Sequence, residues 1–226
     1  MSGTGTGSAA TAVDHLVVAA ASLDAGVAWC EATLGVAPGP GGQHPLMGTH
    51  NRLINIAGPA FPEAYLEIIA IDPDAPPPGR ARWFGLDDAG LQARIATGPQ
   101  LIHFVARSSK LDKHRWGLIT LGCKPGDPVS ASRDTAQGRL SWQILVRSDG
   151  GLDANGALPT LIQWQGMHPT QHMPSSGVVL QSLSLHGLPP RAKDVLRLRG
   201  VQVQAEPGPA LVATLATPRG DVTLQA

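Results

Sequence analysis

Four polar side chains stand inside otherwise apolar segments that are predicted to be strands: His15, Glu67, His103 and Gln163. Glu67 lies in the segment YLEII, and Gln163 lies in the segment LIQW. A carboxylate among apolar neighbours costs free energy unless it is paired or bound to a metal ion. Imidazole and carboxylate together suit Zn²⁺, Ni²⁺, Mn²⁺ or Fe²⁺. These residues therefore predict a divalent-metal site, provided that the fold brings them together.

An internal duplication would bring them together. The segment VDHLVVA, which contains His15, precedes a helical stretch that contains Trp29. The segment LIHFVA, which contains His103, precedes a similar stretch that contains Trp116 at nearly the same distance. Both helical stretches end in the motif WxxxTLG, in which the glycine suits a left-handed helix end. The chain is therefore predicted to contain two copies of one module.

The sequence after each helix is typical of strands, and turn signals separate these strands. We expect one more short strand in each copy, near Met47 in the first and near Val129 in the second. Each copy is then a βαβββ module, which predicts an α+β fold. Longer strands are predicted over residues 51–57 and 65–71 in the first copy, and over 139–146 and 158–164 in the second.

The remaining segments complete the domain organisation. Residues 1–11 are small and polar and are predicted to form a flexible tail. Residues 12–170 form the paired domain, with modules over about 12–72 and 100–166 and a proline-rich connector over 73–99 that carries a helix over 80–96. Residues 171–226 repeat the βαβββ pattern weakly without a ligand at the histidine position, so we expect them to form a third, degenerate segment.

Each polar strand residue has a simpler explanation when it is taken alone. A single strand histidine is usually a core residue, and a single strand glutamate usually faces solvent. The duplication favours a shared site, because it pairs His15 with His103 and Glu67 with Gln163. His15, His103 and Glu67 would satisfy a set of two histidines and one carboxylate. Such a set leaves positions for a bidentate oxygen substrate and could stabilise an enolate.

The pattern DHLVV, then a helix with Trp29 and a Leu-Gly end, then YLEIIA resembles the vicinal oxygen chelate superfamily. The segment GGQHPLMGTHNRL is similar to the glyoxalase-like domain family within it. The resemblance covers about residues 13–170 and implies paired βαβββ modules that form curled mixed sheets around a cleft. It implies metal ligands at His15, Glu67 and His103, with Gln163 where a second glutamate stands in the superfamily. That departure argues against glyoxalase I activity itself, in which a metal-bound carboxylate also moves the substrate proton.

Other candidates carry less chemistry. Glu67 is the one carboxylate in the set that could move a proton, and His50 could donate to a substrate at the mouth of the cleft or simply begin a strand. His44, His168 and His172 are predicted to lie in loops that border the cleft. The two cysteines lack metal-ligand spacing and lie beside apolar helix ends, so they are expected to be small core residues. No Gly-x-Ser-x-Gly motif is present.

Composition limits the partners. The chain has 226 residues, of which 42% are hydrophobic and 15% are charged, so it can build a substantial core. Its formal net charge of +0 does not favour nucleic acid or an anionic membrane surface as a partner. The N-terminal residues do not resemble a secretory signal, which favours a cytoplasmic location.

Two functions remain open at this point. The first is a metal-dependent lyase, isomerase or dioxygenase that acts on a small oxygenated molecule. The second is a metal-free protein that binds and sequesters a small molecule, as bleomycin-resistance proteins do, and the amide at Gln163 keeps this alternative open. The third segment could also pair with a second copy through a sheet edge, which would give a homodimer.

Overall fold

The fold is that of a computed structural model, which describes residues 10–135 and 138–226. Most of the predicted tail, residues 1–9, lies outside the described residues. Two βαβββ modules and a third βαβββ segment follow one another, as the duplication predicts. The first module holds β1 (Ala12–Ala19), α1 (Leu23–Thr33), β2 (Gln43–His44), β3 (Thr49–Asn55) and β4 (Tyr65–Ile71). The second holds β5 (Gln100–Arg107), α3 (Leu111–Ile119), β6 (Asp127–Thr135), β7 (Gly138–Val146) and β8 (Thr160–Gln165).

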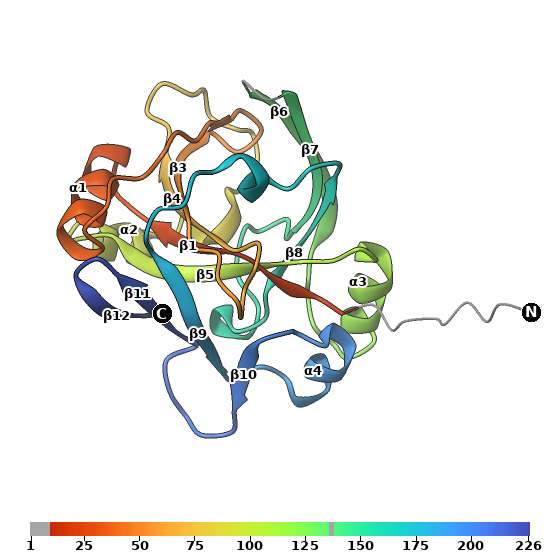
Figure 1. The fold of residues 1–226 in the computed structure, drawn as a ribbon. Coiled ribbons are helices and arrows are strands. Elements are labelled where there is room, and N and C mark those ends of the chain that lie inside the picture. Colours follow the sequence, from red (N-terminus) through yellow and green to blue (C-terminus); the bar gives the residue numbers. More distant parts are fainter. Residues whose placement is uncertain (1–9, 136–137) are drawn as a thin grey trace, which may run out of the picture.

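The two modules share one curled sheet of eight strands, in the order β2-β3-β4-β1-β5-β8-β7-β6. Within each module the first strand pairs in parallel with the last, and β1 and β5 pair antiparallel at the seam between the modules. Figure 1 shows β3 and β4 on one side of the curl and the long β6–β7 hairpin on the other. This arrangement confirms the predicted α+β fold with curled mixed sheets.

Strand register decides which side chains share the inner face. Val17 lies opposite Glu67 across the β1–β4 ladder and opposite His103 across the β1–β5 ladder. Residues that lie opposite one another point to the same face of a sheet, so all three face the same side. His15 joins them, since it lies two residues before Val17 on the same strand. The register thus supports the predicted proximity of these strands.

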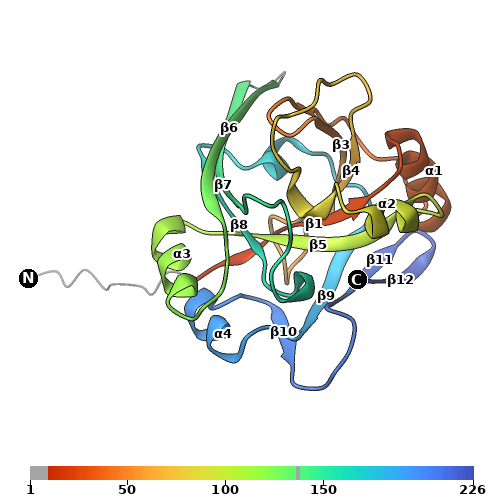
Figure 2. The same ribbon diagram turned by 180° about the vertical axis from the view of Figure 1, so that it is seen from behind.

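The sheet separates two apolar cores. Leu16, Val18 and Phe104 face the core that contains α1, α3 and the third segment. Val17 and Val105 face the inner core within the curl, together with Trp83 and Trp142 among others. Figures 1 and 2 show α1 and α3 at opposite ends of the molecule, with the third segment below the seam strands.

The third segment forms a separate sheet of four strands, in the order β10-β9-β11-β12. It is tied to the first module, because Thr11 donates from both its backbone nitrogen and its hydroxyl to the Leu196 carbonyl, at 3.0 and 2.8 Å. The third segment holds β9 (Val179–His186), α4 (Pro190–Leu196), β10 (Val201–Gln204), β11 (Leu211–Thr217) and β12 (Gly220–Gln225).

Among the described residues, no helix is both long enough and apolar enough to cross a membrane.

The connector differs from the single helix predicted over residues 80–96. It forms a 3-10 turn, η1 (Trp83–Gly85), followed by the short helix α2 (Ala89–Ile95). Phe84 and Gly85 have φ values of 58° and 68°, which no right-handed helix accommodates. Asp88 then starts α2 by accepting a hydrogen bond from the Leu91 backbone nitrogen at 2.7 Å. The break turns Trp83 and Phe84 into the inner core.

Helix α1 supports β4 directly behind Glu67, and we expect its close approach to depend on Gly26. A Cβ atom at Gly26 would lie 2.3 Å from Cγ2 of Ile68, which is fully buried. The Gly26→Ala variant should therefore lower the free energy of unfolding by about 1–3 kcal/mol, measured by urea denaturation. Ala28→Ser on the exposed side of the same helix is the control and should change it by less than about 0.5 kcal/mol. An unchanged midpoint for Gly26→Ala would contradict this packing.

Candidate functional site

A small cavity of about 30 Å³ lies inside the curl of the large sheet. Such a volume holds water molecules or the reacting end of a larger molecule, but not a whole metabolite. Most of its polar lining comes from the first module, where it includes His15, Asn51 and Glu67, and Arg133 of β6 adds a cation from the second module. Aromatic rings close it, among them Trp142 from β7 and Trp164 from β8. Polar side chains therefore line one part of the cavity and aromatic rings line another.

A β-bulge brings Asp14 and His15 to the same side of β1. The β1–β5 register runs from Val13 directly to His15 and leaves Asp14 as the extra residue. The Nδ1 atom of His15 donates to Oδ1 of Asp14 at 2.7 Å. This bond fixes the imidazole so that its other nitrogen, Nε2, faces Glu67.

Asp14 is fully buried and is surrounded by donors. Besides His15, it accepts a hydrogen bond from Trp164 Nε1 at 2.8 Å and one from His168 Nε2 at 3.1 Å. His168 Nδ1 accepts from the backbone nitrogen of Thr170, so Nε2 carries the proton. Burial raises the pKa of the Asp14 carboxyl, but the hydrogen bonds from His15 and His168 outweigh burial and hold it well below its usual range.

Glu67 faces His15 from the neighbouring strand. Its Oε2 atom lies 3.6 Å from Nε2 of His15, and its Oε1 atom accepts from Asn51 Nδ2 at 2.6 Å. When Nδ1 of His15 carries the proton that it donates to Asp14, Nε2 presents a lone pair to the carboxylate. A proton or a cation between these two facing atoms would be stabilised by both of them. The His15–Glu67 pair can therefore hold a positive charge at one point of the cavity.

A second histidine closes the same end of the cavity. His44 is buried, and its Nε2 atom lies 3.4 Å from Asn51 Nδ2, so Asn51 bridges His44 and Glu67. Its Nδ1 atom lies 3.1 Å from the Thr49 hydroxyl oxygen. Burial lowers the pKa of His44 to about 4, which keeps this imidazole neutral at neutral pH.

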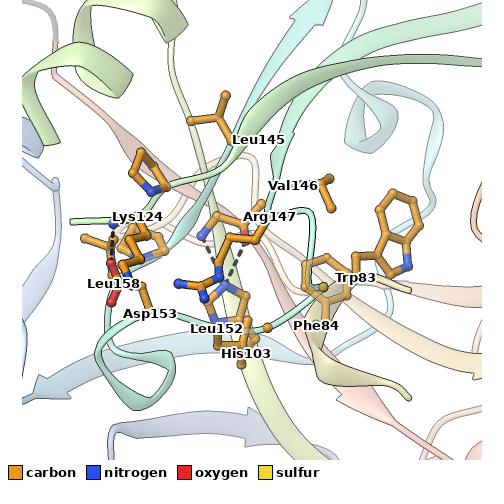
Figure 3. A pocket seen from close by; sticks show the side chains of 15 residues that line it. Trp83, Phe84, His103, Lys124, Leu145, Val146, Arg147, Leu152, Asp153 and Leu158 are labelled. Atoms are coloured by element: carbon orange, nitrogen blue, oxygen red, sulfur yellow. Dashed lines mark hydrogen bonds between the residues drawn. The ribbon is translucent and has the colours of Figure 1, made fainter. Parts of the chain in front are cut away.

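His103 faces the same side of the sheet but lines a different cavity. Its Nδ1 atom donates to the Gly156 carbonyl at 3.1 Å, and its Nε2 atom accepts from the Thr160 backbone nitrogen at 3.0 Å. Trp83 and Phe84 line both cavities, and Figure 3 shows them along one side of the His103 cavity. Burial lowers the pKa of His103 to about 3. With both ring nitrogens engaged, this imidazole has no lone pair left for a ligand.

Gln163 points to the opposite face of the sheet. Its Oε1 atom accepts from the backbone nitrogen of Leu111 at the start of α3, at 3.0 Å. The inward positions of β8 are Ile162 and Trp164, both of which line the cavity. A shift of one residue along a strand moves a side chain to the other face, and this shift separates Gln163 from Glu67.

His50 lies on the face of β3 away from the cavity. It pairs with Ala70 across the β3–β4 ladder, while its neighbour Asn51 points inward. Its Nδ1 atom lies 3.8 Å from Oδ1 of Asp72. Of the residues predicted from sequence, the structure brings His15 and Glu67 together and leaves His50, His103 and Gln163 outside the cavity.

The profile of the glyoxalase-like domain family matches residues 13–198, which is most of the chain. The chain belongs to the glyoxalase-like domain family. The match extends over both modules and reaches into the third segment as far as the end of α4. No protein of curated function matches the sequence.

Solved structures resemble the chain at low sequence identity. A hypothetical protein from Staphylococcus aureus is 16% identical with a TM-score of 0.56, and the match covers 94% of this chain and 84% of that one. Methylmalonyl-CoA epimerase from Mycobacterium tuberculosis is 19% identical with a TM-score of 0.40, and the match covers 69% of this chain and 87% of that one. The Streptomyces coelicolor methylmalonyl-CoA epimerase is 17% identical with a TM-score of 0.42, and the match covers 69% of this chain and 96% of that one. The first likeness shows that the fold extends over nearly the whole glyoxalase-like chain.

Several residues of the glyoxalase-like site carry only weak signals in sequence. His44 and His168 were predicted to border the cleft from loops, and the structure buries both of them beside it. Asp14 could have been suspected, because a charged residue in the middle of an apolar strand is as costly as Glu67. Asn51 has no comparable signal, since asparagine is common at strand ends and in turns.

The side chains as they lie do not fit a metal centre of three or four protein ligands. Among the residues that the structure describes, no group of three His, Cys, Asp or Glu side chains could hold a metal ion. His15 Nε2 and Glu67 Oε2 could share an ion as two ligands, whereas His103 and Gln163 are held elsewhere. Catalytic zinc and iron sites use three protein ligands, so this glyoxalase-like site is one ligand short.

The Asp14 carboxylate should stabilise the glyoxalase-like domain in a pH-dependent way. Its folded-state pKa is depressed, so its contribution is present above the unfolded value of about 4 and is lost as the pH falls below it. Asp14→Asn should lower the free energy of unfolding by about 3–5 kcal/mol at pH 7, because it removes the negative charge and leaves one acceptor oxygen for the three donors of His15, His168 and Trp164.

Urea denaturation of Asp14→Asn and wild type between pH 7 and pH 3 measures this effect. The difference between the two proteins should shrink below about pH 4. The control is Asp134→Asn, an exposed residue of β6, which should stay within about 0.5 kcal/mol of wild type. A difference that is the same at pH 7 and pH 3 would contradict the depressed pKa.

Proposed function

We propose that this glyoxalase-like domain is an enzyme that moves a proton on a carbon next to a carbonyl group of a small molecule. The observation that carries the proposal is the buried pair of His15 and Glu67, whose facing atoms lie 3.6 Å apart at the wall of a cavity. A carboxylate and an imidazole that share one proton can take it from one substrate atom and return it to another. The proposed class is that of isomerases and lyases that pass through an enolate.

The surroundings of Glu67 support its role as the base. It is 5% exposed, and its free oxygen, Oε2, is the one that faces His15 and the cavity. Asn51 holds the other oxygen, Oε1, which fixes the plane of the carboxylate. A base that is held in this way, away from bulk water, keeps its position while the substrate approaches.

His15 is the proposed partner at the substrate oxygen. The ionised Asp14 carboxylate holds Nδ1 and stabilises a positive charge on the imidazole. The Nε2 atom can then donate to an enolate oxygen as the charge develops there. Tyr65 stacks on the imidazole at 4.5 Å between ring centroids and keeps the ring in the plane that points at Glu67.

A divalent ion is the second candidate for the point between His15 and Glu67. The observation that favours it is the Asp14–His15 bond, since a carboxylate that orients an imidazole is typical of metal-bound histidines. Such an ion would supply a Lewis acid for a substrate oxygen. It ranks second because a third protein ligand is lacking among the described residues.

Proton exchange tests the proposed activity. Hydroxyacetone, methylglyoxal and 2-oxobutanoate are incubated with the protein in D₂O, and loss of the C–H signals is followed by NMR. We expect exchange of at least one compound above the buffer rate, and a drop of about 100-fold or more in Glu67→Gln. Glu63→Gln, at a partly exposed residue of the loop before β4, is the matched control and should keep wild-type exchange.

The outcome separates the enzyme from a binding protein. If no compound exchanges faster than in buffer while ligands still bind in the cavity, the enzyme proposal is wrong and a metal-free binding function replaces it. If exchange occurs and survives in Glu67→Gln, another residue is the base.

Metal content tests the second candidate. Protein loaded with Zn²⁺, Ni²⁺, Mn²⁺ or Fe²⁺ and then washed with EDTA should keep well under one ion per chain, because two ligands bind such ions weakly. Elemental analysis measures the retained ion. One ion per chain that is lost in both His15→Ala and His103→Ala would contradict the expectation and would show that His103 joins the site after a rearrangement.

A further inference from the structure

Two hydrogen-bond donors at the cavity have no acceptor. Trp83 and Arg133 line the cavity, and their Nε1 and Nε atoms are buried without a hydrogen-bond partner among the described residues. Trp83 as a whole is 6% exposed. A buried N–H group without an acceptor costs about 1–3 kcal/mol, more when the group is charged. This part of the wall therefore lacks an acceptor that a ligand could supply.

The charge of Arg133 is also unmatched. Among the described residues, no carboxylate lies within 4 Å of its guanidinium group, and its hydrogen bond to Asn51 Oδ1 is long, at 3.4 Å. Asn51 separates Arg133 from Glu67, because its amide nitrogen is bound to the Glu67 carboxylate. A cation beside a small cavity, with its Nε donor without an acceptor, favours an anionic oxygen ligand.

A groove of about 290 Å³ adjoins the cavity and shares His44, Trp83 and Trp142 with it. Val129 and Ala131 line the groove on β6, and Arg133 follows them on the same face of that strand at the cavity. The residues that line the groove include no Asp, Glu, Lys or Arg. Burial keeps His44 neutral by lowering its pKa to about 4. The groove therefore suits an uncharged, largely apolar body.

We propose that the site takes a carboxylate attached to an uncharged apolar body, with the carboxylate at Arg133 and Trp83 and the body in the groove along Val129 and Ala131. The inference rests on the proposed function in that it uses the same cavity, and it names the class of substrate. The carboxylate end enters the cavity that His15 and Glu67 line, so the atoms next to it come to the acid–base pair. Planar guanidinium and carboxylate groups match each other in two parallel hydrogen bonds.

Isothermal titration calorimetry with two probes tests the proposal. The probes are 3-phenylpropanoate and its neutral isostere 3-phenylpropanamide, neither of which reacts. Wild type should bind the carboxylate at least about tenfold more tightly than the amide. Arg133→Met should abolish this preference, and Arg133→Lys should retain part of it. Trp83→Phe removes one N–H group and should weaken carboxylate binding several-fold.

Two controls keep the result specific. Arg139→Met changes an exposed arginine of the same hairpin that bonds Ser132 and does not line the cavity, so it should keep wild-type binding of both probes. Thermal unfolding of each variant shows whether it is folded. If Arg133→Met does not fold, the comparison rests on Arg133→Lys and Trp83→Phe. Equal binding of the two probes, no binding of either up to millimolar concentration, or a preference that survives in folded Arg133 variants overturns the proposal.

Glu67→Gln distinguishes this proposal from the proposed function. The variant removes a negative charge near the proposed carboxylate position, so it should bind 3-phenylpropanoate at least as tightly as wild type while its proton exchange is lost. A carboxylate preference that depends on Arg133, without exchange of hydroxyacetone, methylglyoxal or 2-oxobutanoate by wild type, would support the ligand class and refute the enzyme. Proton exchange by wild type without a carboxylate preference would support the enzyme and refute the ligand class.

Discussion

A buried carboxylate has to be matched by hydrogen-bond donors, and the fully buried Asp14 is such a group. Its two oxygens accept from His15 on the same strand, Trp164 on β8 and His168 beyond β8. These donors come from both modules and from the loop that leads to the third segment, so satisfying one charge fixes how these parts meet. The orientation of His15 toward Glu67, and with it the proposed chemistry, follows from this single group.

The duplication supplies two similar halves, but only one carries the polar site. In the first module, His15 and Glu67 face each other across adjacent strands. In the second, His103 is bound to Thr160 and Gly156, and the inward position near the end of β8 is Trp164. The second module thus contributes aromatic walls, the Trp164 donor and the Arg133 cation, while the first contributes acid and base. This asymmetry places the acid–base pair on one side of the cavity only.

The shape of the cavity depends on backbone conformations that are costly elsewhere. Phe84 adopts a left-handed conformation with φ of 58°, which costs about 1–3 kcal/mol for a bulky residue. In return, its ring and that of Trp83 form the wall between the two cavities. At the other side, Gly41 lies so close to β3 that a Cβ atom would be 2.0 Å from the Asn51 carbonyl oxygen. The loop can therefore lie directly against the strand that presents Asn51 to Glu67.

The sequence by itself determined the two βαβββ modules and the presence of His15 and Glu67 in strands of the first. These follow from apolar periodicity, helix ends and the repeated WxxxTLG motif, all of which are local. Tertiary structure alone decided which face each side chain takes, because a strand alternates with period two and one extra or missing residue reverses it. The bulge at Asp14 turned one carboxylate inward, and the register of β8 turned Gln163 outward. Those choices depend on pairing between distant strands, which no local pattern of residues records.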